Sequence, residues 1–159
     1  MTNVIAPTTE TYGESFLWYG PVKRVQLGLA FLWRQKAFRF LGTYQFLTET
    51  PKTPSFTAGF GVQGIGTGNP GYFVTSEKNF PLGSGRATAY LGVGFRANES
   101  HGHMLGGFKF SPDDDWTLGI QFDGHAKHPF VTRRIAGGFT LGAYLIDAKS
   151  PALLFSVQY

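Results

Sequence analysis

The stretch RATAYLGVGFR, residues 86–96, decides the fold class. Its apolar side chains occupy every second position from Ala87 to Phe95, and arginine, threonine, tyrosine and glycine fill the positions between them. Successive side chains of a β-strand point to opposite faces. This period of two therefore predicts a strand with one apolar face and one polar face.

The same alternation recurs along nearly the whole chain. It is clear at 24–34, 37–48, 55–63, 115–123, 133–146 and 151–159, and it is weaker at 11–19, 71–80 and 102–110. Together with residues 86–96 this makes about ten strands, with eight as the alternative, separated by short polar or glycine- and proline-rich connections. The sequence therefore predicts an all-β, antiparallel up-and-down barrel that forms one domain over residues 1–159, with an irregular segment at 1–10.

Composition favours a transmembrane barrel over a soluble one. Charged residues make up 15% of the 159 residues and aromatic residues 16%, with 22 glycines, whereas roughly 25% of an ordinary globular chain is charged. The non-apolar positions hold mostly small residues, which suit the crowded interior of a narrow barrel better than a solvated exterior. We therefore expect the apolar face to contact lipid. A soluble, lipocalin-like barrel that binds an apolar ligand is the alternative.

Aromatic residues near the strand ends strengthen the membrane interpretation. Transmembrane barrels carry aromatic girdles at both membrane interfaces, on the lipid-facing side. The residues expected in these girdles are Trp18, Trp33, Tyr72, Phe80, Phe95, Trp116 and Tyr159. Strands of about 9–11 residues also match a tilted crossing of the hydrocarbon layer.

The C-terminal segment LLFSVQY, residues 153–159, resembles the final strand of bacterial outer-membrane barrels, which ends in an aromatic residue preceded by alternating apolar residues. The resemblance implies location in the bacterial outer membrane and recognition of this strand by the insertion machinery. The hairpin that begins with SPDDDW, residues 111–116, is similar to hairpins of barrels associated with exopolysaccharide export. Residues 1–10 contain no apolar core of a signal peptide, which an outer-membrane protein needs. Either that signal has been removed from the sequence or the localisation is wrong.

Several charged residues are expected in the lumen by their position in the alternation. They are Arg24, Arg39, Glu77, Arg86, Arg96, Lys109, Asp115, Asp123 and Arg134. Charges inside a barrel wall need partners. We therefore expect a salt-bridged, filled lumen that stabilises a closed barrel, and a path for small anions or an anionic polymer is the alternative.

Four histidines lie in two connections, His101 and His103 in one, His125 and His128 in the other. Connections two apart in a meander emerge at the same rim, so the four imidazoles are a candidate site for zinc, copper or nickel. If Tyr159 ends the last strand in the periplasm, the ten-strand count places these histidines in the periplasm too. Yet residues 124–132 are expected to form the longest connection, and long loops usually face outward.

The sequence favours a non-catalytic function. It contains no cysteine, and its lysines and arginines form no run that would indicate nucleic-acid binding. We expect no cofactor, no nucleic acid, and membrane lipid or detergent as the partner. The expected role is a membrane anchor or assembly component, or a narrow porin-like transport conduit, linked to envelope polymer export. A lipid-modifying hydrolase that uses Ser100 with His101 or His103 is a further alternative, although no nucleophile–base–acid pattern is legible.

Overall fold

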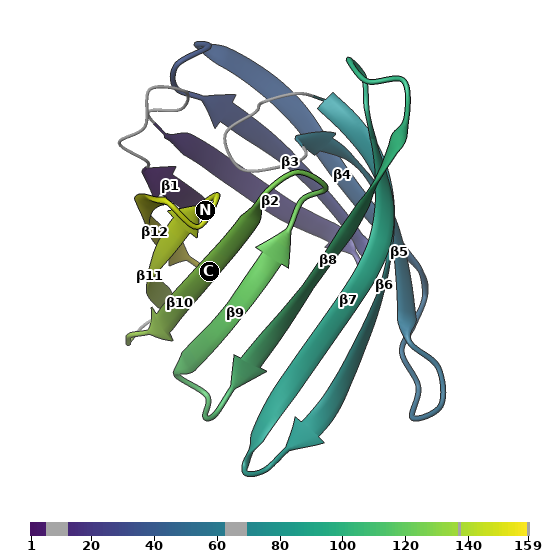
Figure 1. Cartoon of the computed structure of the whole chain (residues 1–159), viewed down its shortest axis with the longest axis vertical. Coiled ribbons are helices and arrows are strands. Elements are labelled where there is room, and N and C mark those ends of the chain that lie inside the picture. Colours follow the sequence, from purple (N-terminus) through teal and green to yellow (C-terminus); the bar gives the residue numbers. More distant parts are fainter. Residues whose placement is uncertain (6–12, 63–69, 137, 159) are drawn as a thin grey trace.

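A computed structural model describes residues 1–5, 13–62, 70–136 and 138–158 of the chain. In this part of the chain twelve strands form a closed antiparallel barrel, in which consecutive strands pair and β1 pairs with β12 (Figure 1). The strands are β1 (Thr2–Ile5), β2 (Glu14–Val22), β3 (Val25–Leu32), β4 (Ala37–Leu47), β5 (Ser55–Val62), β6 (Pro70–Leu82), β7 (Gly85–Arg96), β8 (Gly102–Ser111), β9 (Trp116–Phe122), β10 (Lys127–Arg134), β11 (Phe139–Ile146) and β12 (Ser150–Val157). No helix in the described residues is long and apolar enough to cross a membrane.

The all-β barrel is confirmed, but the expected count of about ten strands is wrong. One additional strand is β1, which lies in the segment expected to be irregular and which closes the barrel. At four residues it is too short for a period of two to be read from the sequence. The remainder of that irregular segment, residues 6–10, lies outside the described residues.

The other additional strand is β10, most of which was expected to belong to the long connection at 124–132. Pro129 suggested a loop, because proline cannot donate to a sheet ladder. The structure accommodates Pro129 near the start of β10. At this position β10 is already paired with β9, but its pairing with β11 begins only at the next residue, Phe130. The expected strand at 133–146 is divided by a turn, closed by a hydrogen bond of 2.7 Å from the Ile135 amide to the Phe139 carbonyl. Odd-numbered residues face outward on both sides of this turn, so the alternation in the sequence continues without a break and gives no sign of the turn.

The register divides the side chains of each strand into an inward set and an outward set. The buried side chains of Ala30, Leu32, Leu41 and Tyr144 lie at inward positions, whereas Phe40, which is 77% exposed, lies at an outward one. This agrees with the faces expected for the strands at 24–34 and 37–48.

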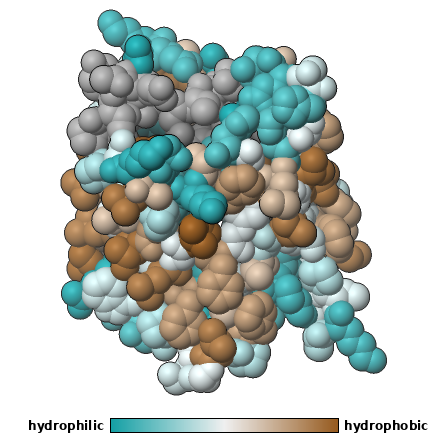
Figure 2. Space-filling model, viewed as in Figure 1, coloured by the Kyte–Doolittle hydropathy of each residue, from teal (hydrophilic) through white to brown (hydrophobic). Residues whose placement is uncertain are grey.

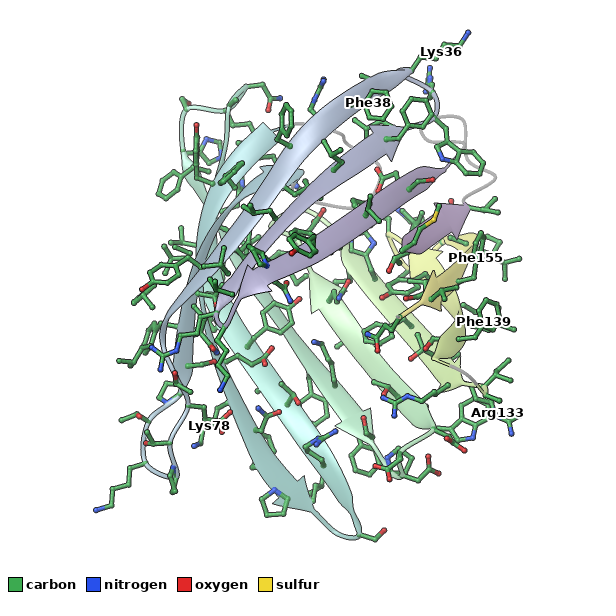
Figure 3. The ribbon with its side chains drawn as sticks, turned by 180° about the vertical axis from the view of Figure 1, so that it is seen from behind. Lys36, Phe38, Lys78, Arg133, Phe139 and Phe155 are labelled. Carbon is green, nitrogen blue, oxygen red and sulfur yellow. The ribbon has the colours of Figure 1, made fainter. Side chains whose placement is uncertain are left out.

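The outer wall is apolar between two polar ends. Hydrophobic residues form a broad band across the middle of the molecule in Figure 2, with hydrophilic residues above and below. In Figure 3 Phe38, Phe139 and Phe155 project from the wall, while Lys36 and Lys78 lie toward opposite ends of the barrel. Among the described strand residues, outward positions carry a charge only at Lys78, Lys127 and Arg133, all toward strand ends.

Most of the expected aromatic girdle faces outward. Exposed outward rings at the two ends of the barrel include those of Trp33, Tyr72, Phe80, Phe95 and Trp116. The expectation that Trp18 faces outward is wrong, because Trp18 pairs with inward Gly28 and its ring lies on the lumen side. Tyr159 lies outside the described residues.

Aromatic rings on the lumen side lie across glycines on the neighbouring strand. Tyr90 pairs with Gly107, Phe130 with Gly119 and Trp18 with Gly28, and in each pair a Cβ at the glycine would overlap the ring. Glycine gives each ring room to lie flat against the wall, as in the aromatic rescue of glycine in sheets.

The interior is also less polar than expected. Val4, Tyr144 and Ala152 form a buried apolar cluster, against which Phe16, Phe130, Ile146 and Leu154 pack. The rings of Phe130 and Tyr144 stack with their centroids 5.0 Å apart. One wall of the lumen, formed by β10–β12 with β1 and β2, is therefore a hydrophobic core.

Gly107→Ala is expected to destabilise the barrel by about 1–3 kcal/mol, because the new methyl group would overlap the Tyr90 ring. Gly106→Ala is the matched control. A Cβ at Gly106 lies 3.5 Å from its nearest neighbour, an ordinary contact, so this change should be neutral or slightly stabilising. Urea unfolding of the refolded protein in detergent measures both, and equal losses would contradict the account of ring packing.

Candidate functional site

The histidine-bearing turns lie at one end of the barrel. The turn 97–101 joins β7 to β8, and the turn 123–126 joins β9 to β10 (Figure 1). Both chain termini lie at the opposite end, where Met1 and Val157 exchange backbone hydrogen bonds of 2.7 and 2.8 Å. This corrects the expectation that the C-terminus and the histidine loops share one side of the membrane. The additional strand β10 is the reason, because five strands, β8 to β12, and not four follow the turn 97–101.

Glu99, His103 and His125 form a compact cluster between the two turns. Their ligand atoms lie within 4.8 Å of one another. The Glu99 carboxylate contacts Nε2 of His103 and lies 3.3 Å from Nε2 of His125. The His103 and His125 rings have centroids 4.2 Å apart.

Of the four histidines expected to meet, the structure therefore brings His103 and His125 together. The His101 ring lies beside that of His103, with centroids 4.6 Å apart, but it does not belong to the compact cluster. His128 is only 2% exposed and faces other partners. Its Nδ1 accepts a hydrogen bond from the Asp147 amide, and its Nε2 lies 3.5 Å from the Asp123 carboxylate.

Arg96 links Glu99 to Asp123. Its side chain is buried, and its guanidinium lies 3.5 Å from Glu99 and 3.3 Å from Asp123. The other carboxylate oxygen of Asp123 accepts hydrogen bonds from the amides of His125 and Ala126, which shapes the turn at 123–126. One buried cation is thus shared by a carboxylate from each turn.

Gly124 allows the two turns to approach. It has a φ of +96°, a conformation that L-residues rarely adopt, and a Cβ at this position would lie 2.5 Å from the Cβ of His103. Any other residue would have to push the turn 123–126 away from β8.

The surroundings keep both carboxylates ionised. Burial opposes ionisation of Asp123, but the hydrogen bond with His128 and those from the Ala126 and His125 amides hold its pKa below the usual range. Burial likewise opposes ionisation of Glu99, and its pKa is nevertheless lowered by hydrogen bonding to His125 and by the charges of His103 and Arg96. The cluster therefore presents anionic oxygens to a cation.

The structure brings only some of the expected lumen charges together. Arg96 meets Asp123, and Lys109 lies 4.0 Å from Glu77. Arg24 and Glu77 help to line a polar cavity of about 490 Å³ toward the end that carries the termini. Arg39 bonds to the Phe38 carbonyl. Arg86, Asp115 and Arg134 are exposed toward the end of the barrel that carries the termini.

Glu99 is the residue that the sequence prediction overlooks. It lies in the same short turn as His101 and four residues before His103. This closeness of a carboxylate to two histidines in the sequence is the signal that could have identified Glu99. Within the described residues, no hydrogen bond joins the Ser100 hydroxyl to His101 or His103.

No protein-family model, curated protein or solved structure matches this chain. Chemically, two imidazoles and one carboxylate match the ligand set of some zinc sites in proteins.

Asp123→Asn is expected to lower the free energy of unfolding by about 1.5–3 kcal/mol, because it removes a charged hydrogen-bond partner of buried Arg96. The asparagine retains an oxygen for the amides of the turn. Asp147→Asn is the control. Asp147 pairs with Lys149 in an exposed salt bridge. Loss of this salt bridge should change the free energy of unfolding by less than about 1 kcal/mol. Urea unfolding in detergent measures both, and indistinguishable midpoints would contradict the assigned role of Asp123.

Proposed function

We propose that this chain is a small integral outer-membrane β-barrel without catalytic activity, in which side chains occupy the lumen. The observation that carries the proposal is the distribution of charge on the wall. Among the strand residues that the structure describes, outward charges occur only toward strand ends, and mostly apolar side chains occupy the zone between them. A wall exposed to water has no reason to exclude charge from its middle, whereas a bilayer strongly disfavours charge there.

The soluble, lipocalin-like alternative fits this wall poorly. Leu91, Met104 and Leu153 lie outward and are 59%, 60% and 64% exposed. A soluble monomer rarely exposes so extensive an apolar surface. An apolar groove of about 600 Å³ over β10–β12, lined by Val131, Ala143 and Leu153 among others, continues this surface, and acyl chains of the bilayer would fill it.

Within the membrane, an anchor or assembly component fits better than an open conduit. Tyr90 and Phe130 lie across lumen glycines, and Phe130 stacks on Tyr144 within the apolar core. Polar cavities of about 490 and 620 Å³, lined by Arg24 and by Thr2 among others, are found on the β1–β6 side of the barrel, away from this stacked pair. Because residues 111–116 resemble hairpins of barrels associated with exopolysaccharide export, we propose that the anchor or assembly component serves envelope polymer export.

We propose that the end carrying the termini faces the periplasm. Outer-membrane barrels have short periplasmic turns and longer external loops. The connections at this end are two residues long at 23–24 and 83–84, and 48–54 is a longer one of seven residues. In this orientation the cluster of Glu99, His103 and His125 faces the cell exterior.

Membrane insertion is tested with single-tryptophan variants, since the chain has 3 tryptophans. The variants retain Trp33, Trp116 or Trp18, with phenylalanine at the other two positions, and are folded into vesicles of phosphatidylcholine with brominated acyl chains. Bromine should quench the outward Trp33 and Trp116 strongly and the inward Trp18 weakly. A protein that is monodisperse in plain buffer, with no quenching of Trp33 or Trp116, would refute membrane insertion.

Planar-bilayer recording separates the anchor from the conduit. The wild-type barrel should show no stable open-state current, because rings occupy its lumen. Replacing both Phe130 and Tyr144 by alanine removes a stacked pair from the lumen and should increase conductance. A large, stable current from the wild-type protein would instead establish a conduit.

A further inference from the structure

We propose that Glu99, His103 and His125 bind one divalent transition-metal ion of the zinc class. The site would join the turn 97–101 and the start of β8 to the turn 123–126. This inference does not rest on the proposed function, because the three residues lie at the rim of the barrel and not on its apolar wall.

The three donor atoms already lie close together. Metal bonds of about 2.0–2.2 Å to nitrogen and oxygen place neighbouring ligand atoms of a tetrahedral ion about 3.4 Å apart. Nε2 of His125 lies 3.3 Å from the Glu99 carboxylate. The ligand atoms of all three residues lie within 4.8 Å of one another, so small side-chain rotations would complete the geometry.

His103 is the buried member of the ligand set. The residue is 7% exposed, and its Nε2 contacts the Glu99 carboxylate. Imidazole nitrogen and carboxylate oxygen are both zinc ligands, so this contact already pairs two donors of the proposed site.

The donor set selects the class of ion. Imidazole nitrogen suits zinc, copper and nickel, whereas calcium and magnesium require mostly oxygen ligands. Three protein ligands also leave a position for water, as in open zinc sites. The Arg96 guanidinium lies 3.5 Å from Glu99 and orients the carboxylate from behind. The two carboxylates of Glu99 and Asp123 share the single guanidinium of Arg96, so they are not fully neutralised by it.

The position explains what such an ion would do. The pairing of β8 with β9 begins at Gly106, so residues 102–105 are paired only with β7. His103 lies in this segment, which has no partner on the β9 side, and His125 lies in the turn opposite it. A bound ion would hold the two hairpins together where the backbone ladder is missing.

The test uses the full chain without an affinity tag, folded in detergent and freed of metal, and titrates it with ZnCl₂ by calorimetry. We expect one Zn²⁺ per chain and a higher urea midpoint when Zn²⁺ is present, since an ion that binds only the folded state stabilises it. CaCl₂ and MgCl₂ should produce neither effect. An unchanged midpoint at saturating Zn²⁺, or binding of Ca²⁺ in its place, would overturn the proposal.

Variants assign the ligands. Glu99→Gln and His125→Ala should each weaken Zn²⁺ binding at least about tenfold, and the double variant should abolish it. His101→Ala is the matched control, because its ring lies beside the cluster but outside it, and it should bind Zn²⁺ like the wild type. Equal affinity in the double variant and the wild type would refute the assignment, as would loss of binding in His101→Ala alone.

A measurement on the wild-type protein guards against variants that fail to fold. Diethylpyrocarbonate modifies accessible imidazoles, and the His125 side chain is 44% exposed. Zn²⁺ should slow modification of His125, read by mass spectrometry, and leave the rate at exposed His101 unchanged. Equal rates at His125 with and without Zn²⁺ would exclude this residue as a ligand.

Discussion

Closure of the sheet is the constraint on which the rest of the structure depends. An open sheet edge presents a row of unpaired backbone N–H and C=O groups. Here four residues provide the closure, because β1 pairs with β12 from Thr2 to Ile5 and with β2 from Thr2 to Val4. Without β1, the edges of β2 and β12 would be exposed, and the chain would have no separate inside and outside.

Closure with twelve strands also determines what the lumen must contain. Barrel diameter grows with strand number, so twelve strands enclose more space than the ten expected from the sequence. Small residues alone would leave that space empty. The inward Trp18 and the core around Tyr144 occupy it, and glycines opposite the rings, such as Gly107, provide room against the wall. A wider barrel thus accounts for bulky side chains at positions where small polar ones were expected.

The sequence predicted the faces of the strands better than their number. A period of two identifies the outward-facing, apolar side of residues 86–96 without any tertiary information, because the pleat alone produces it. It cannot reveal β1, which is too short, or the turn at 135–138, which preserves the phase. The same logic predicted that the histidine turns would meet at one rim. It could not select His103 and His125 or add Glu99, since these contacts depend on how the turns fold.

The rim cluster lies where the ladder between β8 and β9 ends, and this placement has a physical reason. In the described part of the chain, residues 102–105 of β8 have no register partners on the following hairpin, so side chains must hold the turn 123–126 in place. Arg96 does so by sharing its charge between Glu99 and Asp123. Such a link is strong only if it is buried and fully partnered, and Gly124 permits that burial by letting the turn approach His103. The polar chemistry of this rim is therefore a substitute for missing sheet pairing, and the same closeness that allows the substitution assembles the metal-ligand set.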